Sequence, residues 1–107
     1  APTAADTEWQ EISALYDVLS QVSPSPIVEL NRAVAYSMAY GPAAGLKIVD
    51  KLKDEPALKK YHLLPAVRGD LLAKLKRHEE ASAEFRRAAS LTKNEQERAL
   101  LLKQSTN

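Results

Sequence analysis

Few residues of this chain have the types and spacings that chemistry requires. The 107 residues include two histidines, His62 and His78, and no cysteine, which excludes disulfides and thiolate zinc sites. A metal or acid–base site would need a partner at a set spacing, such as a second histidine four residues away on a helix, and neither histidine has one. No glycine-rich phosphate loop and no nucleophile–base set is present. We therefore expect no enzyme, no cofactor and no metal, and we expect both histidines to be structural.

The pair Asn31-Arg32 interrupts an apolar helical pattern and is a candidate contact for a protein partner. Asparagine is a poor helix former, so in a helix interior it needs a compensating hydrogen bond or an exposed contact. In the structural reading, Asn31 bonds a loop and Arg32 pairs with Glu29 or Asp17. In the functional reading, both side chains lie in the groove that receives the partner.

Arg68 and Asp70 flank Gly69 and are the second candidate pair. They could form an ion pair between structural repeats, or line the concave face that the first helix of each helix pair provides. The partner-binding candidates are therefore Asn31, Arg32, Arg68 and Asp70.

A basic strip could instead contact nucleic acid. Its members are Lys47, Lys51, Lys53, Lys59, Lys60, Lys74, Lys76 and Arg77. Acidic residues are interspersed among them, and the whole chain has 15 basic and 14 acidic side chains, a net charge of +1. Because nucleic-acid-binding domains carry a one-sided basic excess, the strip is better read as solvated surface.

The elements that must position these residues are all helices. Apolar residues recur at spacings of three and four, and no alternating strand pattern is present. The pattern predicts helices over residues 7–22, 26–39, 42–53, 63–75, 78–91 and from 94 onward. In the first of them, an apolar stripe is expected to face the core; it consists of Trp9, Ile12, Leu15, Leu19 and Val22.

Small residues at Gly69, Ala81 and Ala88, with an aromatic ring at Phe85, are typical of a tetratricopeptide-type helix pair. Two antiparallel helices approach closely where one presents a small residue, and the ring fills the wedge beside them. Ala35 precedes Gly69 by 34 residues, the repeat length of such arrays. We predict an all-α, tetratricopeptide-like helical-hairpin array of about six antiparallel helices.

The length fits a single domain spanning residues 1–107, cut from a longer protein, with flexible ends at residues 1–6 and 104–107. The longest stretch without a charge, Ala33 to Leu46, is broken by Gly41-Pro42 and is shorter than the ~20 apolar residues of a membrane span. No membrane partner is expected.

Blocks of sequence between about Trp9 and Leu102 resemble one protein family. The most specific are residues 30–35 (LNRAVA) and 41–46 (GPAAGL); others are residues 9–12 (WQEI), 15–17 (LYD), 61–64 (YHLL) and 68–72 (RGDLL). The chain resembles the C-terminal tetratricopeptide-like extension of extracytoplasmic-function (sigma-70 family) RNA polymerase sigma factors. Lys76 departs from that pattern, since the family usually has glycine there.

The resemblance implies a regulatory domain of a bacterial, cytoplasmic sigma factor. Such a domain would act in transcription initiation by contacting the sigma core regions or RNA polymerase, and promoter DNA would be bound by the full-length protein rather than by this domain. Dimerisation of the isolated domain is conceivable if it exposes an apolar face. Two alternatives stay open: a generic tetratricopeptide protein-binding module of another assembly, and a helical domain that contacts nucleic acid.

Overall fold

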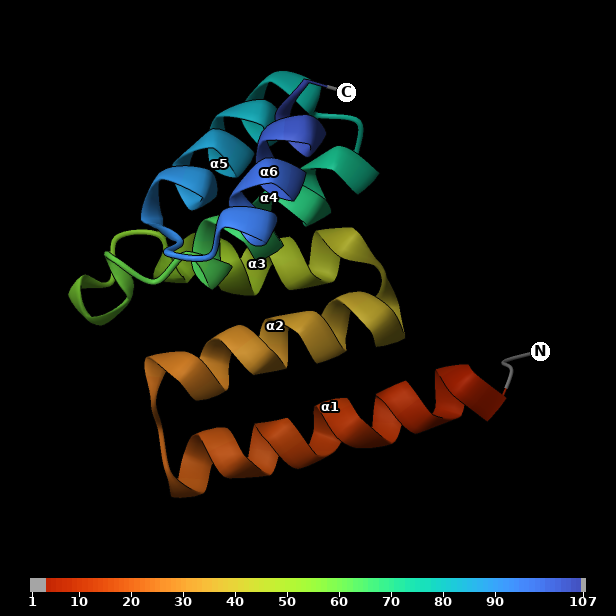
Figure 1. The fold of residues 1–107 in the computed structure, drawn as a ribbon. Helices are drawn as coiled ribbons and strands as arrows, with labels where there is room; N and C mark the ends of the chain where they lie inside the picture. Colours follow the sequence, from red (N-terminus) through yellow and green to blue (C-terminus); the bar gives the residue numbers. More distant parts are fainter. Residues whose placement is uncertain (1–3, 107) are drawn as a thin grey trace.

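All regular secondary structure is helical over the residues that the computed structural model describes, which are 4–106, with side chains from residue 7 (Figure 1). The ends expected to be flexible are residues 1–6 and 104–107. Of these, residues 1–3 and 107 lie outside the described residues, and residues 4–6 and 104–105 are helical. The elements are α1 (Ala4–Val22), α2 (Pro26–Tyr40), α3 (Pro42–Leu52), the short 3-10 turn η1 (Pro56–Leu58), α4 (Leu63–Lys74), α5 (His78–Leu91) and α6 (Glu95–Ser105). The predicted all-α hairpin array is thus confirmed. None of these helices is long and apolar enough to cross a membrane.

Short-range signals explain where the helices begin. The Ser25 side chain accepts hydrogen bonds from the amides of Ile27 and Val28 at the start of α2, where Pro26 occupies the first turn. The Asn94 side chain accepts from the Glu97 amide at 3.0 Å and caps α6 in the same way. Each cap satisfies an amide that the helix leaves unpaired.

Two residues with positive φ end helices. Gly41, after α2, has φ 103° and ψ 163°, a conformation almost restricted to glycine, and not the left-handed helical one that its position suggests. Lys76, after α4, has φ 63° although it carries a side chain. The Arg77 amide donates to the Leu72 carbonyl at 2.9 Å, closing a Schellman turn. Lys76 thus adopts, with a side chain, the left-handed conformation that usually favours glycine.

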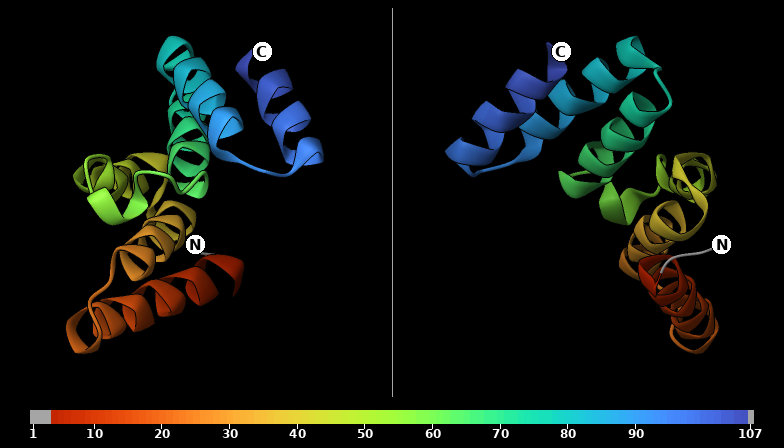
Figure 2. Two further views of the ribbon diagram at one scale, coloured as in Figure 1. Left: turned by 60° about the vertical axis from the view of Figure 1, so that its left-hand side comes forward. Right: turned by 90° about the vertical axis from the view of Figure 1, so that its right-hand side faces the viewer.

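The helices form a single row in which each packs on its neighbours in the chain (Figures 1 and 2). The buried apolar core runs from α2 to α6, and none of the described side chains of α1, from residue 7 onward, belongs to it. Its best-buried members include Val49, Leu64, Leu71 and Leu72. Leu58 of η1 closes this core beneath the long loop between α3 and α4.

Close helix approach occurs where glycine lies at a crossing. A methyl group added to Gly69 would lie 3.0 Å from the Phe85 ring, which confirms that α4 and α5 meet at this pair of residues. Gly45 on α3 is tighter, since an added Cβ would lie 2.7 Å from the Ala33 carbonyl oxygen of α2. Ala81, Phe85 and Ala88 are all buried, as their spacing predicts.

The apolar stripe of α1 is largely exposed, whereas the sequence pattern predicts that it faces the core. Leu15 is 69% exposed and Val22 is 77% exposed, whereas among the described side chains of this helix Ser13 is the buried one. The reason is that α1 packs mainly on α2, which leaves its opposite face uncovered. Trp9, another member of the stripe, is half-buried for the same reason.

Replacing Gly45 with alanine tests the closest crossing. We expect Gly45→Ala to lower the free energy of unfolding by about 1–3 kcal/mol, because the new methyl group would meet the α2 backbone, which cannot move aside. This cost outweighs the better helix propensity of alanine. Gly69→Ala is the matched control and should cost less, since the Phe85 ring can yield by a few tenths of an ångström. Urea denaturation of both variants measures the difference. Equal stability of Gly45→Ala and the wild type would contradict this account of the α2–α3 crossing.

Candidate functional site

Arg32 lies at the centre of a polar cluster that joins α1 to α2. Its guanidinium donates to Asp17 Oδ1 on α1 at 2.7 Å and to Glu29 Oε2 on α2 at 3.2 Å. The guanidinium carbon lies 4.8 Å from the centre of the Tyr36 ring, and the Tyr36 hydroxyl donates to Asp17 at 2.8 Å. The expected pairing of Arg32 with Glu29 or Asp17 is confirmed, and Arg32 makes both pairs.

The charges of this cluster stabilise one another. The hydrogen bond to Asp17 is the main reason that the pKa of Arg32 lies above its ordinary value. Burial alone would raise the pKa of Asp17, but hydrogen bonds from Arg32 and Tyr36 outweigh it and hold that pKa below its ordinary value of 3.8. Burial, followed by the bond to Asp17, raises the pKa of Tyr36. Asp17 and Arg32 therefore form a permanent ion pair at neutral pH.

A similar ion pair recurs 36 residues along the chain. Arg68 on α4 donates to Asp50 Oδ1 on α3 at 2.9 Å, and its guanidinium lies 3.5 Å from Glu84 on α5. Burial would lower the pKa of Arg68, but these two carboxylates raise it above its ordinary value. Arg32 and Arg68 each join the helix that carries them to the preceding helix. The two arginines lie 36 residues apart and their two aspartate partners 33 apart, because the loop that contains η1 lies between Asp50 and Arg68.

Asn31 and Asp70 differ from the two arginines because both are exposed. Asn31 makes no side-chain hydrogen bond within the described part of the chain. Asp70 forms only an ion pair with Lys74 one turn along α4, at 3.0 Å. The four candidates are therefore not gathered into one site: Arg32 and Arg68 hold helices together, and Asn31 and Asp70 are available to a partner.

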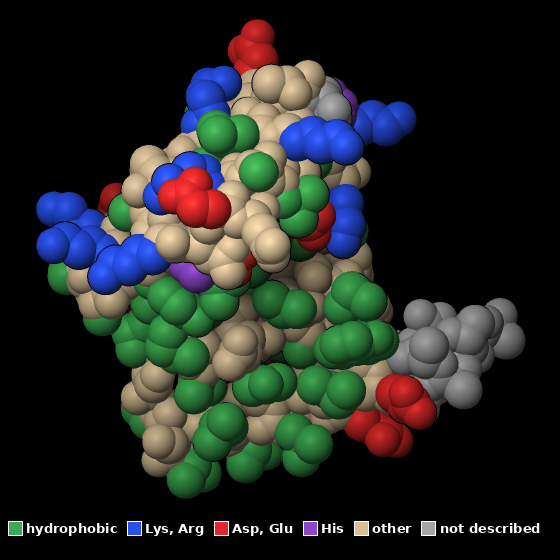
Figure 3. Space-filling model, viewed as in Figure 1, with side chains coloured by type: hydrophobic (Ala, Val, Ile, Leu, Met, Phe, Trp, Pro, Cys, Tyr) green, Lys and Arg blue, Asp and Glu red, His purple; other side chains and the backbone are tan. Residues whose placement is uncertain are grey.

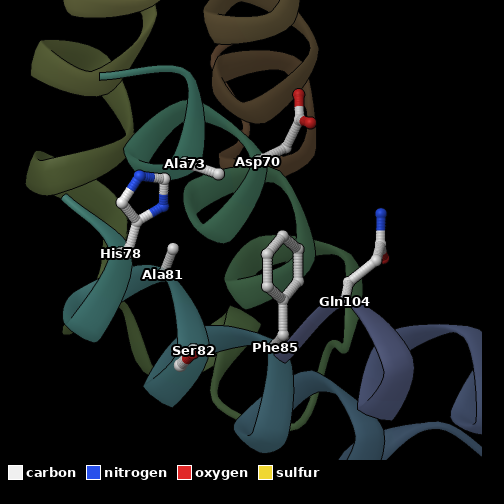
Figure 4. A pocket seen from close by; sticks show the side chains of 7 residues that line it. All are labelled: Asp70, Ala73, His78, Ala81, Ser82, Phe85 and Gln104. Carbon is white, nitrogen blue, oxygen red and sulfur yellow. The ribbon is translucent and has the colours of Figure 1, made fainter. Parts of the chain in front are cut away.

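Asp70 borders a cavity of about 200 Å³ between α4, α5 and α6. In Figure 4 the Phe85 ring lies in the middle, with Asp70 and Gln104 to one side and His78 to the other. This cavity offers an aromatic floor and a carboxylate at its rim.

The two histidines lie in different surroundings. His62 Nε2 lies 3.0 Å from Glu97 Oε2, so His62 links the start of α4 to α6. It precedes α4 directly, but its side chain makes no capping hydrogen bond. His78 is exposed in the first turn of α5. Within the described residues no group of three or more histidine, cysteine, aspartate or glutamate side chains could hold a metal ion.

The basic strip is exposed and has acidic side chains beside it. Lys74 pairs with Asp70, and Arg77 donates to Glu80 at 2.6 Å. These local pairs reduce the positive field that a nucleic acid would meet.

Two exposed apolar surfaces were not anticipated as candidate sites. Hydrophobic side chains gather over α1 and α2 on the face shown in Figure 3. The exposed large hydrophobic residues of these two helices include Leu15, Val18, Leu19 and Val22 on α1, and Ile27 and Met38 on α2. A smaller apolar cavity of about 120 Å³ lies between α4 and α6, beside Leu63 and Leu100. The signal for the first surface is present in the sequence, since the apolar residues of α1 occupy a wider arc than one neighbouring helix can cover.

Comparison with known proteins gives one relative to describe. The chain is 43% identical over 95 residues to an uncharacterized protein of Rhizobium meliloti (strain 1021), a match that covers 89% of this chain and 22% of that protein. The chain thus spans about a fifth of the length of its relative. No protein-family model matches the sequence, and no solved structure does.

Removal of the Asp17 carboxylate tests the α1–α2 ion pair. We expect Asp17→Asn to lower the free energy of unfolding at pH 7 by about 0.5–1 kcal/mol, a range suited to a partly exposed pair. Because folding lowers the pKa of Asp17, the pair stabilises the protein above pH ~4 and this contribution is lost as the pH falls through the lower, folded-state pKa. The difference between wild type and variant should therefore shrink from pH 5 to pH 2 in urea titrations. Asp70→Asn is the control and should change stability by less than about 0.5 kcal/mol; a pH-independent difference for Asp17→Asn would contradict the ion-pair account.

Proposed function

We propose that this chain is the regulatory C-terminal domain of an extracytoplasmic-function RNA polymerase sigma factor. It acts in bacterial transcription initiation, in the cytoplasm, by contacting the sigma core regions or RNA polymerase. It works by binding rather than by catalysis, and promoter DNA is contacted by the longer protein of which it is a part.

The observation that carries the proposal is where the family-like residues lie in the fold. The block at residues 30–35 includes Arg32 of the α1–α2 ion pair and Ala33, which lies at the closest crossing. The block at residues 41–46 includes Gly41, which ends α2, and Gly45, which faces Ala33. The residues that give the sequence its resemblance are thus the ones on which this helix array depends.

Two further observations support a binding role in a longer protein. The relative from Rhizobium meliloti is bacterial and about five times the length of the matched region, which agrees with a domain that works as part of a larger chain. The exposed apolar side chains of α1 and α2 agree with protein contact, because soluble domains rarely leave wide apolar patches without a partner.

Calorimetry with separately purified sigma core regions of the longer protein tests the proposal. The domain should bind them, with an affinity that changes little between 50 and 300 mM salt, because apolar contact dominates the exposed surface. Promoter DNA is the parallel ligand and should not bind. Asn31→Ala should weaken the complex, and Lys59→Ala, in the basic strip, should leave it unchanged.

The opposite result would replace the proposal with the nucleic-acid alternative. That result is no binding to the sigma regions together with DNA binding that falls steeply with salt. Transcription provides an independent check, since a sigma factor lacking the domain should drive its promoter more weakly than the full-length protein.

A further inference from the structure

The two helices at the ends of the row have exposed apolar residues. Helices α2 to α5 each have a packed helix on either side, whereas α1 packs mainly on α2 and α6 mainly on α5 (Figure 2). In helical repeat proteins the end helices normally carry a polar outer face, and these two depart from that rule. The residues concerned are Leu15, Val18, Leu19 and Val22 on α1, and Leu100 and Leu102 on α6.

The outer side of α1 is acidic over its first half and apolar over its second. One line of exposed residues runs along it at spacings of three and four: Glu8, Glu11, Leu15, Val18 and Val22. The two glutamates form no ion pair with any described residue, and α1 contains no lysine or arginine. A helix that covers this side must therefore bring a cation to the glutamates.

The outer side of α6 has both a cation and apolar groups. Ala99 and Lys103 are exposed one turn apart, on the side of α6 opposite the buried Leu101. Leu100 and Leu102 are exposed beside them. Lys103 forms no ion pair with any described residue. The small side chain of Ala99 leaves room for a large one on a facing helix.

The outer sides of α1 and α6 match when the two helices run antiparallel. Lys103 follows Ala99 by four residues, as Leu15 follows Glu11. When Leu15 of one copy rests on Ala99 of another, the Lys103 ammonium therefore lies beside Glu11. The 11 residues of α6 are about 16 Å long at ~1.5 Å per residue, which is the length of the line from Glu11 to Val22.

Pairing of like ends leaves part of these surfaces unsatisfied. A copy of α1 laid antiparallel on α1 would bring the glutamates of each against the apolar half of the other, near Val22. Charges placed against apolar surface without a partner are costly. A copy of α6 laid on α6 would leave the apolar half of α1 exposed. Pairing of unlike ends covers both apolar surfaces and gives Glu11 a cation.

We propose that α1 of one copy of this chain binds α6 of a second copy, antiparallel, so that the row of helices continues from one molecule into the next. The contact joins two different surfaces, so a dimer still presents one uncovered α1 and one uncovered α6, and longer assemblies form as the concentration rises. Because the contact is one short helix on another, the association is weak and reversible. This inference goes beyond the regulatory role proposed above and does not depend on it.

Two variants that each block one end test the proposal. Leu15→Glu/Val18→Glu blocks α1 and Ala99→Glu/Lys103→Glu blocks α6; all four side chains are exposed, so circular dichroism should stay that of the wild type. In sedimentation equilibrium the average mass of the wild-type chain should rise above that of the monomer between about 10 µM and about 1 mM, whereas each variant alone should stay monomeric. An equimolar mixture of the two variants should form a dimer, because each supplies the end that the other lacks.

Other results would overturn the proposal. A wild-type chain that stays monomeric over this range would show that a different protein covers α1. A blocked variant that still associates alone, or a mixture that stays monomeric, would show that copies meet through other surfaces.

Engineered cysteines identify the ends that meet, since the chain has no cysteine of its own. Leu15→Cys and Ala99→Cys chains, mixed equally and mildly oxidised, should give the mixed disulfide in at least about tenfold excess over each symmetrical dimer, whereas random collision gives about twofold. A predominance of Leu15→Cys or Ala99→Cys symmetrical dimers would overturn the pairing of unlike ends.

Charge exchange tests the register of the two helices. Lys103→Glu should weaken association about threefold to tenfold, and Glu11→Lys in the same chain should restore it, because the pair re-forms with its signs reversed. Lys47→Glu, at an exposed lysine of α3, is the control of equal charge change and should associate as the wild type does. A double variant that associates no better than Lys103→Glu alone would overturn the proposed register.

Discussion

The arrangement of helices in a single row is the constraint on which this structure depends. Each helix buries side chains mainly against its neighbours in the chain, so neighbouring helices must approach closely wherever they cross. Gly45 meets the α2 backbone and Gly69 meets the Phe85 ring because a larger residue would hold those helices apart. The same constraint leaves the first helix with one neighbour, and it therefore explains both the tight interior and the exposed apolar end.

The row of helices also gives polar residues two roles, either joining neighbouring helices or facing outward. Arg32 and Arg68 each lie where one helix passes the preceding one, and each finds an aspartate there at hydrogen-bond distance. Their recurrence indicates that the ion pairs set the relative positions of successive helices. Asn31 lies on the same helix as Arg32, but its side chain is exposed. These adjacent residues therefore have different roles, since Arg32 joins two helices and Asn31 faces outward.

The sequence predicted the helices well because their signals are local. Pro26 and Pro42 in first turns, Gly41 between helices, and the spacing around Phe85 each depend on a few neighbouring residues. The prediction that the apolar stripe of α1 is buried was wrong. Such a stripe indicates which face of a helix is hydrophobic, but it does not indicate whether a neighbouring helix covers that face. The ion partners of Arg68 could not be predicted from the sequence pattern either. Asp50 and Glu84 lie on two other helices, and the loop around η1 determines how α3 is placed beside α4.

The central claim is that α1 is the most weakly packed helix of the row, because none of its described side chains joins the buried apolar core. Hydrogen–deuterium exchange, followed residue by residue, tests it directly. In the isolated domain the amides of residues 12–20 should exchange at least about tenfold faster than those of residues 66–73 in α4. Equal protection of α1 and α4 would contradict the account.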